Sequence, residues 1–185
     1  MRFCENRLIA KIVLVVCVLI SIFGFGGGGL RSERAEILLV FEEGTDTSLS
    51  SRHSMDAYLD QASESAALLA QEAGIYLDES DIPARVSEEA QSMKSEEDLS
   101  ERSRIYSALK EDVELLHTAL RAENLTDEQL TNAQIAYYDF KGAVNKIDND
   151  AYSSLAEAFN RKISRFPANF LAKLFGITKV ETFEA

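Results

Sequence analysis

The chain has 185 residues, a length that suits one domain plus an anchor, and 46% of them are hydrophobic, enough to build a core. Its formal net charge is −12, and residues 33–139 carry 25 acidic side chains against 8 basic ones. This acidic stretch argues against nucleic acid and anionic lipid headgroups as its partners, because both would repel it. Both cysteines, Cys4 and Cys17, precede it, which excludes a disulfide framework, a cysteine-ligated metal and a cysteine nucleophile from the main domain.

Residues 1–30 are predicted to form an N-terminal membrane anchor or signal segment that ends in a glycine hinge at residues 26–29. Residues 12–25 carry no charge, and residues 8–10 extend the apolar run to about the lower limit of the roughly 17–25 residues that cross a bilayer. Basic residues before the run and glycines after it also suit a signal peptide, so retention and cleavage both stay open. Positive charge is greater before the run than after it, which favours a cytoplasmic N-terminus and an extracytoplasmic main domain.

Residues 31–185 are predicted to form the main domain, and their apolar residues recur at spacings of three and four, which indicates helices. The first helix follows the glycines and is interrupted at Gly44. The second helix carries a heptad stripe typical of coiled-coil packing. The first helix has an apolar face of Leu30, Ile37, Leu38 and Phe41, and the stripe of the second comprises Met55, Leu59, Ala62, Ala66, Leu69, Ala73 and Tyr76.

One long helix is then predicted over residues 83–122, because Pro83 suits a first helical turn after a capping residue at 80 or 81. A capping box, T-D-E-Q at residues 126–129, begins the next helix. The apolar seam continues along both helices, through Val86, Ala90, Met93, Leu99, Tyr106, Leu109, Val113, Leu116 and Leu120, and then through Leu130, Ala133, Tyr137, Phe140, Val144, Ile147, Ala151, Leu155, Phe159 and Ile163.

The predicted fold class is therefore all-α. We expect a long antiparallel three-helix up-down bundle with a short C-terminal fourth helix, preceded by an N-terminal transmembrane helix. Few prolines and no alternating apolar pattern argue against a sheet. Alanine along much of the seam implies close helix packing and a slim core.

The densest aromatic cluster of the chain lies at residues 164–176, in the stretch S-R-F-P-A-N-F-L-A-K-L-F-G. Pro167 is expected to end one helix or to begin another, because it cannot lie inside a continuous helix without the loss of a backbone bond, and Gly176 suits a C-cap. The aromatic rings of Phe166, Phe170 and Phe175 are expected to be buried and to close the end of the bundle. The alternative is that these rings are exposed and bind a partner or the bilayer surface.

The C-terminal residues form a specific series: Tyr152, Phe159, Asn160, Ile163, Phe166, Pro167, Asn169, Ala172, Phe175, Gly176, Phe183 and Glu184. In this series the chain resembles the C-terminal region of the LemA family of bacterial membrane-anchored helical proteins. It departs from the family at Ser153, where asparagine is usual, and it lacks the family's basic run and "PNL"-like motif, so it resembles a divergent member. The resemblance implies a membrane-tethered helical bundle and carries no catalytic residues across.

Few residues suit catalysis or metal binding. Glu114 and His117 have the Glu-x-x-His spacing of a di-iron ligand pair, but the other histidine, His53, has no glutamate three residues before it. Asp148 and Asp150 lack the glycine and the closing glutamate of a calcium loop. Glutamate pairs such as Glu88–Glu89 and Glu96–Glu97 could perform acid–base chemistry, but they are interpreted as solvated helix surface. The sequence therefore predicts no catalytic, cofactor-binding or metal site and no cofactor.

The sequence predicts a non-enzymatic, single-pass cell-membrane protein of LemA-like kind. The lipid bilayer would hold its N-terminal helix, and its acidic helical domain would act through contacts with an unknown protein partner. The alternative is a secreted helical binding protein that signal peptidase releases. A carboxylate-based enzyme is the third hypothesis, and the sequence offers it the least support.

Overall fold

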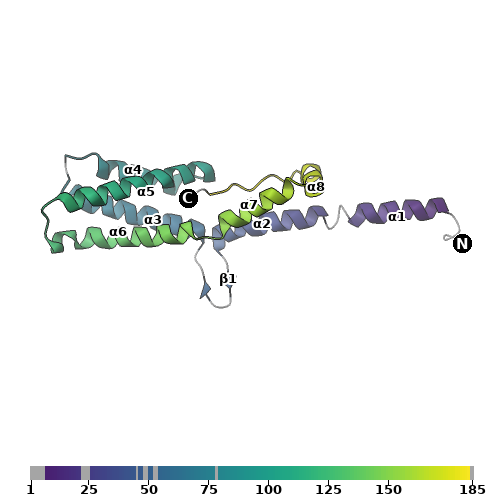
Figure 1. Cartoon of the computed structure of the whole chain (residues 1–185), viewed down its shortest axis with the longest axis horizontal. Helices are drawn as coiled ribbons and strands as arrows, with labels where there is room; N and C mark the ends of the chain where they lie inside the picture. Colours follow the sequence, from purple (N-terminus) through teal and green to yellow (C-terminus); the bar gives the residue numbers. More distant parts are fainter. Residues whose placement is uncertain are drawn as a thin grey trace. The chain divides into compact units, whose positions relative to one another are not determined.

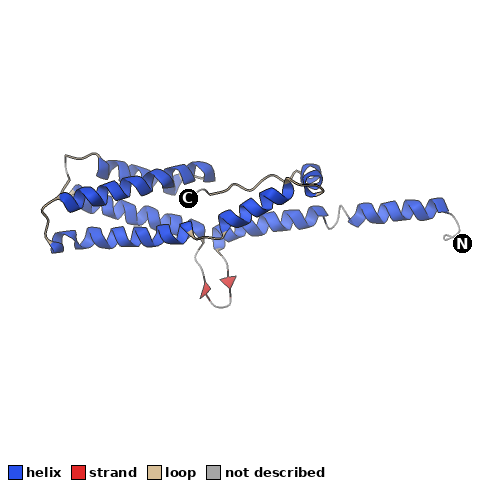
Figure 2. Ribbon diagram, viewed as in Figure 1, coloured by secondary structure: helices blue, strands red, loops and turns tan. Residues whose placement is uncertain are grey.

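The computed structural model describes residues 7–21, 26–44, 46–47, 50–51, 54–77 and 79–183. Within these residues the protein is all-α, as predicted, apart from two strands of two residues each (Figure 2). The strands β1 (Asp46–Thr47) and β2 (Ser50–Ser51) pair in an antiparallel hairpin. Cys4, residues 22–25 of the apolar run, His53 and Glu184 lie outside the described residues.

Contacts within the chain divide it into two units. The first unit comprises residues 1–38 and 155–180, and the second comprises residues 39–154 and 181–185. Helix α2 (Gly28–Glu43) ends in the second unit, and helix α7 (Tyr152–Ile163) begins there.

Four helices form most of the second unit: α3 (Met55–Gly74), α4 (Ile82–Ser95), α5 (Leu99–Ala122) and α6 (Asp127–Asp148) (Figure 1). Short connections join them, and successive helices run in opposite directions in Figure 1. Side-chain contacts between α5 and α6 agree, because Tyr106 pairs with Asp148 whereas Glu114, further along α5, pairs with the earlier residue Tyr137. The helices of this unit therefore form an up-down bundle.

The prediction of one continuous helix over residues 83–122 is wrong, because residues 96–98 separate α4 from α5. The side chain of Asp98 caps α5 and accepts a hydrogen bond from the backbone N–H of Glu101 over 2.9 Å. The side chain of Glu96 accepts a hydrogen bond from the backbone N–H of Asp98, also over 2.9 Å. These carboxylates satisfy backbone donors that a continuous helix would bond internally, so the chain turns here and the bundle has four helices in place of three.

The predicted helix starts at Thr126 and Pro83 and the predicted C-cap at Gly176 are confirmed, whereas the helical seam predicted to run from Leu130 to Ile163 is broken between α6 and α7. Thr126 and Gln129 form the expected capping box, in which the Thr126 N–H donates to Gln129 Oε1 over 2.8 Å. Pro83 lies in the first turn of α4. The D-N-D segment forms a bend between α6 and α7, and Gly176, with a φ of 64°, ends the last helix in the left-handed conformation that glycine favours.

Small side chains allow α3 to approach its neighbours closely. Along α3, the alanines at 62, 66 and 73 are fully buried, together with Leu59 and Leu69. Within the bundle, α3 makes its most extensive contacts with α6 and α4 and far fewer with α5. The core of the bundle is therefore slim, as the alanine-rich seam predicted.

One charged side chain lies within this core. Arg102, on α5, is only 7% exposed, and its guanidinium group pairs with Asp56 and Asp60 on α3, the second pair at 3.2 Å. Asp56 and Asp60 are four residues apart, or about one turn of α3, and their carboxylates remain partly exposed to solvent. Arg102 thus joins α5 to α3, where few close backbone contacts exist, and the sequence analysis did not single it out.

The first unit contains α1 (Arg7–Ser21), most of α2 and α7, and α8 (Ala168–Phe175). Its extended segment 177–180 is attached to α7 by the side-chain amide of Asn160. This amide donates to the carbonyl of Val180 over 2.7 Å and accepts from its N–H over 2.9 Å. The buried apolar residues of this unit are Leu30, Ile37, Ala156, Phe159, Ile163, Ala172, Ile177 and Val180.

The prediction that the C-terminal aromatic rings are buried is wrong for Phe166 and Phe170, which are 85% and 61% exposed. Phe175 is half-buried. Helix α8 has only eight residues, and both of its sides carry apolar residues. One side contacts the remainder of the first unit, and the other side, which carries Phe170, lies in solvent.

Among the described residues, no helix has both the length and the apolar composition needed to cross a membrane. The predicted transmembrane helix is represented by α1, which has 15 residues.

The close approach of α3 can be tested by enlarging one buried alanine. Ala66→Leu should lower the free energy of unfolding by about 1–3 kcal/mol, because added methyl groups overpack a filled core. Ala67→Leu is the matched control, since Ala67 is only partly buried and lines an open groove, so it should change stability little. Urea denaturation followed by circular dichroism measures both values. Equal effects of the two substitutions would contradict the packing described for α3.

Candidate functional site

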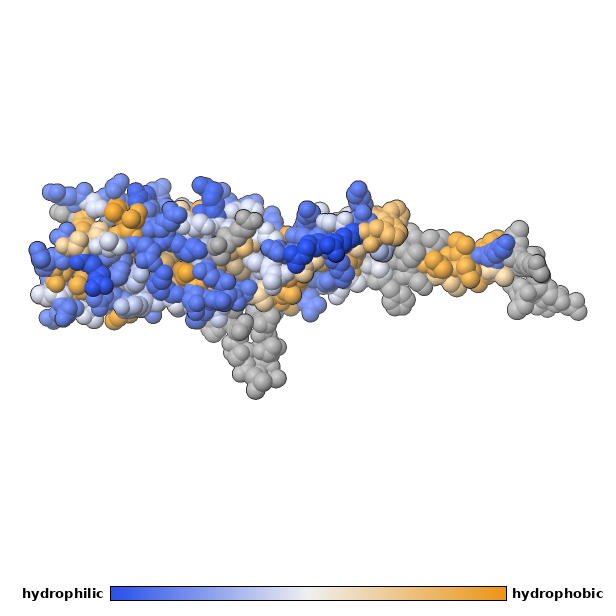
Figure 3. Space-filling model, in the orientation of Figure 1, coloured by the Kyte–Doolittle hydropathy of each residue, from blue (hydrophilic) through white to orange (hydrophobic). Residues whose placement is uncertain are grey.

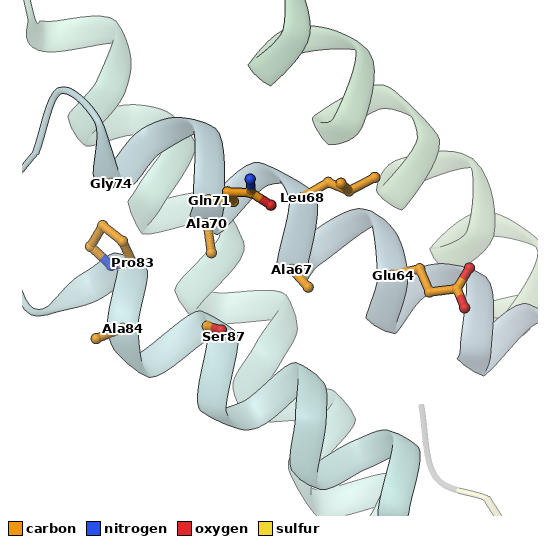
Figure 4. Close-up of a pocket in the computed structure, with 9 residues that line it drawn as sticks. All are labelled: Glu64, Ala67, Leu68, Ala70, Gln71, Gly74, Pro83, Ala84 and Ser87. Atoms are coloured by element: carbon orange, nitrogen blue, oxygen red, sulfur yellow. The ribbon is translucent and has the colours of Figure 1, made fainter.

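An open groove of about 770 Å³ lies between α3 and α4 (Figure 4). The short side chains of Ala67, Ala70 and Ser87 leave the space between the two helices unfilled, and Glu64 and Gln71 add polar groups. Among the residues that line the groove there is no histidine or cysteine. The arrangement suits apolar groups better than a charged substrate. The full lining comprises Glu64, Ala67, Leu68, Ala70, Gln71, Gly74, Pro83, Ala84 and Ser87.

A pair of carboxyl groups lies between α4 and α5. Burial raises the pKa of Glu89 to about 7, and the negative charge of Asp112 adds to the rise. The Oε2 atom of Glu89 is buried and receives no hydrogen bond from the described residues. Arg85 donates to both oxygens of Asp112, with 2.8 Å between Nη2 and Oδ1, and its positive charge opposes the rise at Glu89.

The carboxyl group of Glu89 is therefore expected to gain or lose a proton near neutral pH, as a general acid or base must. The surrounding cavity, of about 430 Å³, is lined largely by further charged side chains, including Glu88 and Arg104. Ion-pair networks also shift pKa values without any catalytic role. We interpret the pair as part of such a network, because no histidine or cysteine lines the cavity.

The Glu-x-x-His pair on α5 is engaged by α6. The carboxylate of Glu114 accepts from the hydroxyl of Tyr137 over 2.8 Å and from Lys141 Nζ over 2.7 Å. The His117 ring stacks on the Tyr137 ring, with 3.7 Å between centroids and 6° between planes. These contacts hold α5 against α6 and leave the pair poorly placed to bind a metal. In the part of the chain that the structure describes, no group of three potential metal ligands exists.

The contacts of this cluster also determine its proton equilibria. The hydrogen bond from Lys141 lowers the pKa of Glu114, and the hydrogen bond from Tyr137 adds to this effect. Burial lowers the pKa of His117, with a contribution from the positive charge of Arg121. Burial and the hydrogen bond to Glu114 raise the pKa of Tyr137 to about 12. At neutral pH the cluster therefore combines an ionised Glu114 with neutral His117 and Tyr137, which suits a structural contact.

An exposed apolar surface lies on the first unit. We define the α8 face as Phe170 and Leu174, which are four residues apart on α8, together with Phe166 in the turn that precedes the helix; they are 61%, 48% and 85% exposed. Figure 3 shows apolar residues over α8 and over α1, whereas the bundle surface is largely hydrophilic. These aromatic rings were predicted from the sequence to be buried. Their exposure agrees with the alternative interpretation, an exposed binding surface.

Comparison of the chain with protein-family models, with curated proteins and with solved structures found no match. The function proposed below is therefore inferred from the sequence and the structure of this chain.

The proton equilibrium of Glu89 predicts a specific dependence of stability on pH. The folded state binds this proton more tightly than the unfolded chain, so the stability contributed by Glu89 falls as pH rises from about 4.5 through about 7. Glu89→Gln, which cannot ionise, should match the wild type near pH 4.5 and exceed its stability at pH 8. Urea denaturation at the two pH values measures the difference. Glu111→Gln, at an exposed position of α5 that does not contribute to the shift at Glu89, is the control and should show no gain at pH 8 relative to pH 4.5.

Proposed function

We propose that this protein is a non-enzymatic helical protein that its N-terminal segment tethers to a membrane, and that it acts through contacts with another protein. It is a divergent protein of LemA-like kind in this proposal, with the acidic domain outside the cytoplasm. The observation that carries the proposal is the surface of α1. Residues 12–16 are five successive apolar residues, and each is between 45% and 64% exposed.

Five successive helical residues cover the whole circumference of a helix, because each residue turns it by about 100°. Residues 12–16 of α1 therefore leave no polar side to turn toward water, and a helical segment that is hydrophobic all round is typical of a buried or membrane-inserted segment. The charged residues of α1, Arg7 and Lys11, precede this segment. Its 15 residues reach about 22 Å at 1.5 Å per residue, against roughly 30 Å for a bilayer core. In the sequence, Ile22, Phe23 and Phe25 continue the apolar run beyond α1.

Two further observations support the non-enzymatic part of the proposal. Glu114 and His117, the best candidate ligand pair, are engaged in contacts between helices. Glu89, which titrates near neutral pH, lies among other charged side chains. The acidic stretch of residues 33–139 favours a protein partner with a basic surface, since opposite potentials attract.

Membrane retention is tested by placing arginine in α1. The full chain should remain with the membrane pellet after a carbonate wash. Dissolved ions screen a charge contact between a protein and a membrane, but they do not weaken hydrophobic insertion in the same way. Val15→Arg combined with Val18→Arg should release the protein, since each arginine costs about 2.5–3.5 kcal/mol in the centre of a membrane helix. Leu68→Arg with Leu115→Arg is the control, because it adds the same charge to exposed positions of the bundle and should leave the protein in the pellet.

The mature N-terminus distinguishes the proposal from its alternative. A wild-type protein recovered from the medium, beginning near Gly28, would support the secreted binding protein and contradict the tether. Protease added outside intact cells should cut the acidic domain, and protection that disappears on lysis would contradict the proposed topology.

A further inference from the structure

Helix α8 has two apolar sides with different environments. On one side, Ala172 is buried, and Leu171 and Phe175 are partly buried. On the other side, the α8 face of Phe166, Phe170 and Leu174 is exposed. A soluble protein rarely leaves a contiguous group of large apolar residues in water, so such a face indicates a binding surface.

The inner side of α8 is fixed against the glycines that follow the apolar run. A β-carbon on Gly26 would lie 2.8 Å from Leu171 Cδ1, and one on Gly27 would overlap the Phe175 ring. Only glycine fits at such contacts without a shift of the neighbouring side chain. Arg31 on α2 adds a polar tie, since its Nη2 donates to the carbonyl of Phe175 over 3.0 Å. These contacts hold α8 beside the start of α2, with the α8 face turned outward.

The length of chain between α1 and these glycines limits how far α8 lies from the apolar helix. Gly26 follows Ser21, the last residue of α1, by five positions, and a fully extended chain spans at most about 3.6 Å per residue. The backbone that contacts α8 is therefore within about 18 Å of the end of α1, whatever path the chain takes. If α1 is inserted in a bilayer, α8 is held at or close to the headgroup layer.

The charge around α8 is opposite to that of the bundle. Residues 155–180 contain five basic residues and one acidic residue, whereas residues 33–139 have a net charge of −17. Arg165 immediately precedes Phe166, Lys173 immediately precedes Leu174, and both are exposed. Aromatic and aliphatic groups flanked by basic side chains are the composition of segments that lie in the interface of an anionic membrane.

We propose that the α8 face inserts Phe166, Phe170 and Leu174 into the interfacial layer of the membrane that holds α1, with Arg165 and Lys173 on anionic lipid headgroups. This inference rests on the proposed tether. It gives the first unit a second membrane contact besides α1. The lipid-binding segment is the basic C-terminal one, so the repulsion expected between the acidic stretch and anionic headgroups does not oppose it.

The absence of tryptophan from the chain allows a direct test. The full-length Phe170→Trp variant, incorporated into vesicles of phosphatidylcholine and phosphatidylglycerol, has a single indole at the α8 face. Its emission should shift to shorter wavelength, and lipids brominated close to the headgroup should quench it several-fold more strongly than aqueous iodide does. Tyr138→Trp on α6 is the matched control, because Tyr138 is an aromatic residue of similar exposure, 67%, in the acidic bundle. Its emission should be quenched by iodide and not by the brominated lipids.

The basic flanks can be tested in the same assay. In the Phe170→Trp background, Arg165→Glu with Lys173→Glu should reduce quenching by brominated lipids in vesicles that contain phosphatidylglycerol. The same pair of substitutions should have a much smaller effect in vesicles of phosphatidylcholine alone, because the lost attraction is to the anionic headgroup.

The outcomes separate this inference from the proposed tether. A Phe170→Trp protein that floats with the vesicles but is quenched by iodide as strongly as Tyr138→Trp would overturn the α8 contact and leave the tether intact. Protection from both iodide and brominated lipids would also overturn it, in favour of a protein or a second copy on the α8 face. A full-length protein that fails to float with vesicles would overturn both proposals.

Discussion

The bundle depends on how closely α3 approaches its neighbours. The buried alanines of α3 bring its backbone near those of α4 and α6, and helices at such short distances leave little volume for side chains between them. All four helices nevertheless contribute large, fully buried residues, and those of α5 include Tyr106, Leu109 and Leu116. Arg102 compensates for the greater separation there, since its long side chain reaches the carboxylates on α3. A charge in this position also favours one register of α5 against α3, because Arg102 reaches both Asp56 and Asp60 only when it lies between them.

Much of this architecture could be predicted from the sequence. Apolar spacing identified nearly every core residue of the bundle, and the capping box and Pro83 located two helix starts, because these signals act within a few residues. The break at residues 96–98 was missed, although the seam carried a sign of it. Met93 and Leu99 are six residues apart, and glutamates occupy the positions where an apolar residue was due. Arg102 lies in a similar gap in the apolar pattern, between Leu99 and Tyr106. Such a gap shows that an apolar residue is missing, but it does not show whether the polar residue in its place is buried or which partner it has.

The candidate binding surface could be predicted only in part. The sequence shows that α8 is apolar and that Pro167 separates it from α7, but both sides of the helix carry large apolar residues, so composition cannot decide which side is buried. That choice is made by Gly26 and Gly27, which accept Leu171 and Phe175 and are far away in the sequence. The glycines at residues 26–29 were predicted to form a hinge, and two of them, Gly26 and Gly27, lie against α8. The pKa of Glu89 is likewise a property of tertiary structure, since it arises from burial beside Asp112.

The contact between Arg31 and Phe175 joins residues 144 positions apart, and this separation bears on how the protein is made. During synthesis, at about 5–20 residues per second, the 144 positions from Arg31 to Phe175 take about 7–29 seconds to add, so the start of α2 is made well before α8 exists. Over that interval the bundle helices, whose contacts are nearer in sequence, can assemble, whereas Gly26, Gly27 and the apolar side of α2 have no partner. Interaction of the N-terminal segment with the insertion machinery or with a chaperone would therefore precede completion of the first unit. In the proposed membrane-tethered protein, α8 would complete the first unit only after insertion of the N-terminal segment.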